Sequence, residues 1–461
     1  MKSADFLGNV RVDYDELDMT ADRLTLALLE ELPNGAKRED DKLAVESLSA
    51  IGNVRADVKS ENVKVYADRL FADPAKDQLE LFGTPASDTA PATFARVVRP
   101  DATLAGEHLV MNETGGTVDV PGPGSFDFLP DADNPGKTVH ITWATSMHYD
   151  DLAGQAKFLG DVKTLSTDGT DTNELMGDDL VLTFVKDDST DAKADAASVS
   201  GGGAAGRRLA TAVMNSNVRF RARSYATAER KDLVTELFLI GPRMEFNDPG
   251  LSAPAGPDEA LQQVQVIGTG RMLITDMRPK DENEATAKPA NGSNPASIDI
   301  AGRGRTAFEW SDRLILDLTH GEMLMKGAVA MVHQPEEGER VQLDCQDLAA
   351  ELKKPRDKKK SSGWLSEDAP KPELSRVWAD HGIRILHGPA TVTCDHLLYE
   401  EDKREIILWS DEPNVVTFES EGEPTPAKSS AFKWHRDTGR VEAFKLRTGT
   451  IPLRRSEREK N

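Results

Sequence analysis

The sequence predicts an all-β protein in which antiparallel strand-turn-strand units are stacked one on another. Apolar and polar residues alternate over many short runs, as they do in strands with one buried face. A four-residue step recurs along the chain, which is typical of repeat architectures. Stretches with helical periodicity are scarce in the 461 residues, so strands are the favoured elements.

The clearest unit occupies residues 308–332. Apolar residues alternate over 314–318, a Gly-containing turn follows at 319–321, and alternation resumes over 323–331. Two alternating runs around such a turn predict a β-hairpin with one buried face. The unit begins with a small residue, two polar residues and a leucine.

This small-polar-polar-Leu step occurs seven times. The copies begin at Ala21, Ala67, Gly106, Gly177, Ser311, Cys345 and Cys394. Neighbouring copies lie about 35 to 50 residues apart where none is missing. Each unit of a stacked repeat packs mainly on its neighbours, so irregular spacing predicts insertions in the loops. The sequence Gly-Asn-Val-Arg, at residues 8–11 and 52–55, marks a second recurring position.

Composition divides the chain into two blocks. Residues 1–185 form the first block of strands and residues 209–453 form the second. Between them, residues 186–208 are rich in Asp, Ala, Ser and Gly, and contain too little apolar surface to order themselves, which predicts a flexible insert. Residues 454–461 form a basic tail.

Charge and motifs exclude several classes of function. The formal net charge is −23, which argues against a nucleic-acid partner because such proteins need a basic patch. No apolar stretch is long enough for a transmembrane helix. HExxH and GxSxG are absent, and the glycine-rich stretch at 302–307 leads into a predicted hairpin rather than a helix. We therefore expect no catalytic residues, no metal site and no cofactor.

The two cysteines, Cys345 and Cys394, occupy the same position of two repeat units. Stacking would place them on the same face of nearby layers. A disulfide and a pair of small buried thiols are both compatible with this position.

The repeat resembles the OstA-like family of lipopolysaccharide-transport proteins, the LptA type. Residues 21–24, 50–55 and 67–70 carry the likeness, while the length and the polar insertions depart from the family pattern. The resemblance implies a β-jellyroll, also called a β-taco, whose groove holds the acyl chains of lipid A. It also implies a periplasmic or cell-envelope location, and association with other family members or further copies through exposed edge strands. The chain begins inside a repeat, so we expect an upstream segment with an export signal.

The expected ligand is therefore lipopolysaccharide or another glycolipid. Long acyl chains suit an apolar groove because each buried CH₂ contributes about 0.8 kcal/mol. Candidate groove-lining residues are core-facing apolar side chains. They are Leu314, Leu316, Met323, Met325, Val329, Met331 and Phe220.

Two other functions remain open at this stage. A structural or adhesive repeat protein would have a closed, fully packed core. A β-solenoid enzyme acting on polysaccharide would have parallel coils of near-constant length and an exposed carboxylate cluster.

Overall fold

The structure is a computed structural model of residues 1–461. It describes residues 2–14, 17–28, 45–84, 93–129, 136–186, 207–227, 229–248, 262–277, 303–336, 338–352, 374–421, 425–435 and 440–447. The predicted insert at 186–208, apart from its two ends, and the basic tail at 454–461 lie outside the described residues.

Every regular element of the described residues is a β-strand. The 29 strands form antiparallel sheet, which confirms the predicted fold class. Two compact units divide the chain. Unit 1 comprises Met1–Asp168, Glu174–Ser216 and Asp248–Pro254, and unit 2 comprises Gly169–Asn173, Asn217–Asn247 and Ala255–Asn461.

Unit 1 holds the first thirteen strands. They are β1 (Lys2–Tyr14), β2 (Leu17–Leu28), β3 (Val45–Val58), β4 (Val63–Asp73), β5 (Gln78–Phe82), β6 (Ala95–Val98), β7 (Ala102–Gly106), β8 (His108–Asn112), β9 (Thr117–Pro121), β10 (Gly124–Phe128), β11 (Thr138–Trp143), β12 (Ser146–Asp150) and β13 (Gln155–Asp168). Two strands carry residues of both units. They are β14 (Asp171–Lys186) and β15 (Arg207–Tyr225).

Unit 2 holds the remaining strands. They are β16 (Leu233–Asn247), β17 (Gln263–Ile267), β18 (Gly270–Asp276), β19 (Gly304–Trp310), β20 (Arg313–Asp317), β21 (Glu322–Pro335), β22 (Val341–Leu352), β23 (Leu374–His387), β24 (Ala390–Glu400), β25 (Glu405–Trp409), β26 (Val416–Ser420), β27 (Ala427–Ser429), β28 (Ala431–His435) and β29 (Arg440–Phe444).

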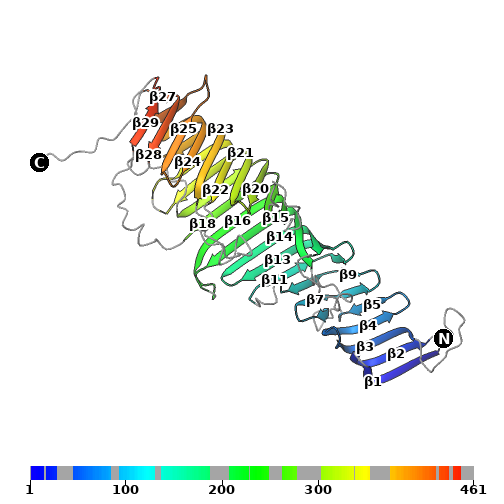
Figure 1. Ribbon diagram of the computed structural model, residues 1–461. Coiled ribbons are helices and arrows are strands. Elements are labelled where there is room, and N and C mark those ends of the chain that lie inside the picture. The colour runs from blue at the N-terminus through cyan, green and yellow to red at the C-terminus, as the bar shows by residue number, and fades with distance from the viewer. Residues whose placement is uncertain are drawn as a thin grey trace. The chain divides into compact units, whose positions relative to one another are not determined.

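Each layer of the stack has two arms that meet at a corner. Long strands such as β4 supply both arms, whereas other layers use two short strands. Thus β5 and β6 both pair with β4, one along each arm, and then pair with β8 and β7. Figure 1 shows β1 to β4 following one another as neighbouring strands. The apolar face of both arms is turned to the inside of the folded sheet.

Left-handed residues make the corners of alternate long strands. Gly52 and Asn53 have φ of 78° and 48°, and Gly327 and Ala328 have φ of 81° and 44°. Such values favour glycine because it lacks the Cβ that clashes in this region. In β3 the two residues oppose one residue of β4, which is the count of a β-bulge and bends the strand.

The recurring sequence step lies on the strands that face these corners. Its second residue opposes the left-handed pair: Asp68 opposes Gly52 and Asn53 of β3, and Gln346 opposes Gly327 and Ala328 of β21. The step is therefore a corner motif, and the next copy lies two layers farther along the sheet. This arrangement explains why copies recur once for every two layers.

Candidate functional site

Unit 1 has a closed apolar row next to the corners. Strand register aligns one inner residue from each of five successive strands along one arm. These residues are Leu24, Ala50, Leu70, Leu81 and Leu109, and they are between 0% and 6% exposed. The corner side of the interior is therefore packed.

One step farther from the corner, the next inner row on the same arm remains half-buried. It runs in register through β2, β3, β4, β5 and β8. Its members are Leu26, Leu48, Ala72, Leu79 and Met111. Side chains of the same apolar kind are thus covered near the corner and partly accessible toward the ends of the arm.

The other arm of unit 1 has a similar row. Val97, Leu104 and Phe126 are aligned across β6, β7 and β10, and all three are half-buried. Phe126 stacks on Phe128 with ring centroids 5.4 Å apart. These three residues and the half-buried row of the first arm are called the open rows below. An exposed run of inner apolar side chains is the usual mark of a binding site.

The later strands of unit 2 are closed at the equivalent distance from their corners. From β22 onward the far inner row of one arm passes through Ala350, Val377, Tyr399, Ile406 and Trp434. These side chains are between 0% and 6% exposed. Tyr399 and Trp434 fill space that Leu and Ala leave accessible between β2 and β8 of unit 1. Farther along unit 1 the same row is closed by Val118, Tyr149 and Ala156.

The structure brings six of the seven predicted groove residues together in unit 2. Leu314 pairs with Met325 and Leu316 pairs with Met323 across β20 and β21. Val329 and Met331 follow on β21, beyond the corner at Gly327, and Phe220 lies apart on β15.

Burial separates these residues into two groups. Leu314, Leu316, Met325, Val329 and Met331 are between 0% and 6% exposed. Met323 and Phe220 are half-buried. The predicted inward direction of the side chains agrees with this burial, and lipid contact at these positions stays a prediction.

Sequence reasoning missed the open rows of unit 1. Their signal is the same alternation that identified residues 308–332, but it is divided among short strands such as β5 and β8. Alternation indicates which side chains face inward, whereas the distance from the corner decides which of them are covered. That distance becomes visible only when the corner residues are placed.

The two cysteines are separate buried thiols. Cys394 pairs with Ile383 of β23, and Cys345 lies on β22 at the other side of β23. Strands two positions apart are about 9.6 Å from each other, beyond the Cα separation that a disulfide spans. Burial raises the pKa of each thiol to about 12, so both are protonated at neutral pH.

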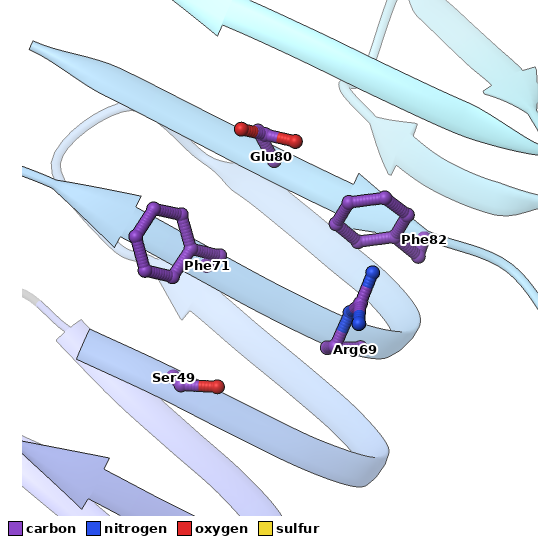
Figure 2. Close-up of a pocket in the computed structure, with 5 residues that line it drawn as sticks. All are labelled: Ser49, Arg69, Phe71, Glu80 and Phe82. Atoms are coloured by element: carbon purple, nitrogen blue, oxygen red, sulfur yellow. The ribbon is translucent and has the colours of Figure 1, made fainter. Parts of the chain in front are cut away.

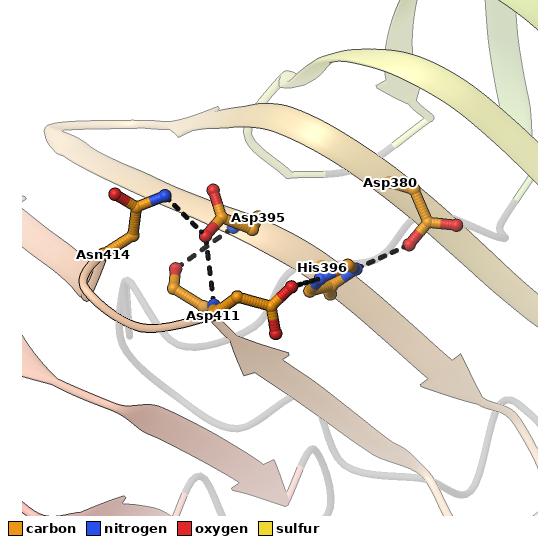
Figure 3. Close-up of polar contacts among 6 residues, drawn as sticks. Asp380, Asp395, His396, Asp411 and Asn414 are labelled. Atoms are coloured by element: carbon orange, nitrogen blue, oxygen red, sulfur yellow. Dashed lines mark hydrogen bonds and ion pairs between the residues drawn. The ribbon is translucent and has the colours of Figure 1, made fainter.

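A polar cluster fixes the corner between β25 and β26 (Figure 3). His396 contacts Asp380 through Nδ1 at 2.7 Å and Asp411 through Nε2 at 3.1 Å. Asp395 accepts hydrogen bonds from the backbone N–H of Asp411 and from the Asn414 amide. Hydrogen bonding to Asp380, partly opposed by burial, raises the pKa of His396. Because these aspartates bind His396, Asn414 and a backbone N–H of the same corner, the cluster has a structural role.

Among the residues that the structure describes, no group of three or more His, Cys, Asp or Glu side chains is arranged to hold a metal ion. That part of the chain likewise contains no helix long and apolar enough to cross a membrane.

Within the described residues, each unit has an edge strand. β1 pairs with β2 along one side, and β29 pairs with β28 along one side. On β1, Phe6 and Leu7 are 47% and 72% exposed. Unpaired N–H and C=O groups on such strands can extend a sheet with another chain.

Among the solved structures that this chain partly resembles is a periplasmic protein. It is LptH, described as the LptA homologous periplasmic component of the conserved lipopolysaccharide transport device from Pseudomonas aeruginosa. The match has 16% sequence identity and a TM-score of 0.21, and covers 26% of this chain and 76% of that chain. No family model and no curated protein matches the sequence.

Proposed function

We propose that this chain is a non-enzymatic protein of the cell envelope that holds the acyl chains of lipopolysaccharide or another glycolipid between the two arms of unit 1. The open rows carry this proposal. They offer apolar side chains on both arms, and the closed row beneath them gives the site a packed floor.

The dimensions of the open rows suit an acyl chain. The five-residue row spans five strands, or about 19 Å at the usual strand spacing. An alkyl chain along it would bury many CH₂ groups at about 0.8 kcal/mol each. Met111 adds an adaptable side chain, and such side chains fit irregular apolar partners. Half-buried leucines need no reorganisation to receive such a ligand.

The edge strands support a second part of the proposal, which is association with another envelope protein or another copy. β1 presents thirteen residues of strand to one open side. Pairing there would continue both the sheet and its inner apolar face, because Phe6 aligns with Leu24 of the closed row. The repeat steps at residues 21–24, 50–55 and 67–70 support the same relation to LptA-type bridge proteins.

The closed core of unit 2 favours a second candidate role for that unit. Tyr399 and Trp434, 0% and 4% exposed, occupy its far inner row. A unit with its interior filled in this way would act as a structural spacer. Lipid contact at the predicted groove residues of β20 and β21 would distinguish lipid binding from this structural role.

Site-directed photocrosslinking tests the proposal. A photoreactive side chain is placed at Leu48 or Leu79 in unit 1, and at Leu316 or Met325 in unit 2. Outward controls are Arg55 and Lys326, which are exposed on β3 and β21. Each variant is expressed with an export signal in an envelope-bearing host, irradiated and probed for attached glycolipid.

We expect adducts at Leu48 and Leu79 and none at Arg55. Adducts at Leu316 and Met325 would show that unit 2 also contacts lipid, whereas their absence would support the spacer role there. If folded variants give no adduct at either unit 1 position, the lipid-binding proposal is wrong.

A further inference from the structure

The outer face of unit 1 carries a stack of three side chains, well away from the inner rows. The guanidinium of Arg69 lies over the ring of Phe82, with Cζ 3.9 Å from the centroid. His108 stacks on Phe82 with centroids 4.2 Å apart and an interplanar angle of 11°. Register places the three residues side by side on β4, β5 and β8.

Glu80 holds this stack in place. Its two oxygens lie 2.9 Å from His108 Nε2 and 2.9 Å from Gln78 Nε2. The carboxylate is therefore held in position by both contacts. A carboxylate has about four lone-pair positions, so Glu80 retains acceptor capacity for a hydroxyl group.

Arg69 differs from the arginine at the same position of the first corner motif. Arg23 binds Asp5 through two nitrogens, at 3.0 and 2.7 Å. Within the described part of the chain, no carboxylate lies within ion-pair distance of Arg69. Arg69 lies over the Phe82 ring, and a guanidinium that stacks on an aromatic face keeps its in-plane N–H donors available for an anion.

These residues border a hollow of about 270 Å³, lined by Ser49, Arg69, Phe71, Glu80 and Phe82. Figure 2 shows Phe71 and Glu80 on neighbouring strands, with Arg69 beside Phe82 and Ser49 on the next strand. The hollow exists because the small Ser49 pairs with the large Phe71 across β3 and β4. It is smaller than the pockets that hold drug-sized molecules.

We propose that this hollow binds a single acidic sugar residue, of the uronic acid type. Phe71 provides an apolar surface for the C–H face of the sugar ring. Arg69 provides paired donors for its carboxylate, an arrangement that is bidentate in well-formed pairs. Ser49 and Glu80 provide a hydroxyl and a fixed acceptor for the ring hydroxyls.

Because the chain has a net charge of −23, an anionic ligand is expected to bind only where a positive side chain is available locally. A negatively charged protein repels anions in general, so an anionic ligand needs a local cation without an internal partner. Among the described residues, Arg69 has no carboxylate within ion-pair distance and so meets this requirement at the hollow. The site lies outside the open rows and does not depend on the proposed lipid function.

Saturation-transfer NMR with methyl glucuronide tests the proposal on the full chain. Methyl glucoside, which lacks the carboxylate, is the neutral comparison. The variants are Arg69→Gln and Phe71→Ala. Arg23→Gln is the matched control, because it changes the equivalent arginine of the neighbouring motif outside the hollow. Thermal unfolding of each variant verifies that it is folded.

We expect methyl glucuronide to bind the unmodified chain and the Arg23→Gln variant with similar affinity. Arg69→Gln should weaken binding about tenfold, which corresponds to about 1.4 kcal/mol. Phe71→Ala should also weaken it. The proposal is overturned if methyl glucuronide gives no transfer signal, if methyl glucoside binds equally well, or if folded Arg69→Gln binds as tightly as the unmodified chain.

Discussion

The indole Nε1 of Trp310 donates a hydrogen bond to the backbone oxygen of Gly268, with the two atoms 3.1 Å apart. Trp143 in unit 1 makes the same bond to Gly122, also at 3.1 Å. Both tryptophans are buried, at 2% and 3% exposure. Each unit thus has a corner of the same kind, in which a tryptophan of the next layer donates a hydrogen bond to the carbonyl of a glycine at the bend.

Gly270 should be intolerant of alanine because of this corner. A Cβ on Gly270 would lie 2.3 Å from Trp310 Cζ2, and an indole ring has little room to move. We expect Gly270→Ala to lower the free energy of unfolding by about 1 to 3 kcal/mol, the usual cost of overpacking. Urea unfolding measures the loss.

A double-mutant cycle with Trp310→Phe identifies the cause of that loss. The smaller ring should relieve the contact with the indole, while the 2.9 Å contact with the Ile240 backbone oxygen remains. The two changes should therefore be less harmful together than the sum of their separate effects. Strict additivity would show that the tryptophan is not what excludes a side chain at Gly270.

Gly382 and Gly327 separate backbone strain from crowding at the corners. Both have positive φ, of 64° and 81°. A Cβ on Gly382 meets nothing within 4 Å, whereas one on Gly327 would lie 2.9 Å from the backbone nitrogen of Asp312. Gly382→Ala should cost roughly 1 to 2 kcal/mol from backbone conformation alone.

Gly327→Ala should cost clearly more than Gly382→Ala, because strain and crowding act together. Urea unfolding of the two single variants under the same conditions provides the comparison. Equal losses would show that the space at Gly327 is not limiting.

His396 should stabilise unit 2 more at acidic pH than at alkaline pH. Hydrogen bonding to Asp380 raises the pKa of His396 above its ordinary value of 6.5. A raised folded-state pKa gives stabilisation that is complete below the unfolded-state pKa and is lost as pH rises through the folded-state pKa. The destabilisation caused by His396→Gln should therefore be larger at pH values below 6.5 than well above it.

Unfolding of the wild-type chain and the His396→Gln variant across this pH range gives the difference directly. Asp380→Asn is the matched variant, since it removes the partner and should flatten the pH dependence of the His396→Gln effect. A difference that grows toward alkaline pH would contradict the assigned direction.

Cys345 and Cys394 should resist thiol reagents in the folded protein. Both are buried, and burial raises the pKa of each thiol to about 12, so little reactive thiolate forms. A colorimetric thiol assay should detect almost no reaction before unfolding and two thiols after it. Two reactive thiols in the native protein, or none after unfolding without a reductant, would contradict this arrangement.

Several features of the fold are readable from particular residues. Alternation around residues 319–321 predicts the hairpin of β20 and β21, because one face of each strand must be buried. The recurring Gly-Asn-Val-Arg sequence marks the position of Gly52 and Asn53, and the left-handed corner found there suits these residue types because they tolerate positive φ. The corner at Ser216 and Asn217, with φ of 59° and 54°, contains no glycine and escapes such a reading.

The candidate sites depend on tertiary relations that the sequence does not display. Leu24 and Leu26 are alike as residues, yet one is covered and the other half-buried because of their distances from the corner. Arg23 and Arg69 occupy the same motif position, yet Asp5 is close enough to bind only the first of them. The predicted groove residues of unit 2 have the expected inward direction, while unit 1 holds the more accessible apolar rows.

Binding of acyl chains by the open rows of unit 1 can be measured with a binding titration. A fluorescent fatty-acyl probe is added to the purified chain and then displaced with lipopolysaccharide. Leu48→Asp and Leu79→Asp place a charge in the open row, and Arg55→Asp places one on the outer face. We expect displaceable binding that is lost in both inner variants and retained in Arg55→Asp. Probe binding that is absent from the folded chain, or unchanged in the inner variants, would contradict it.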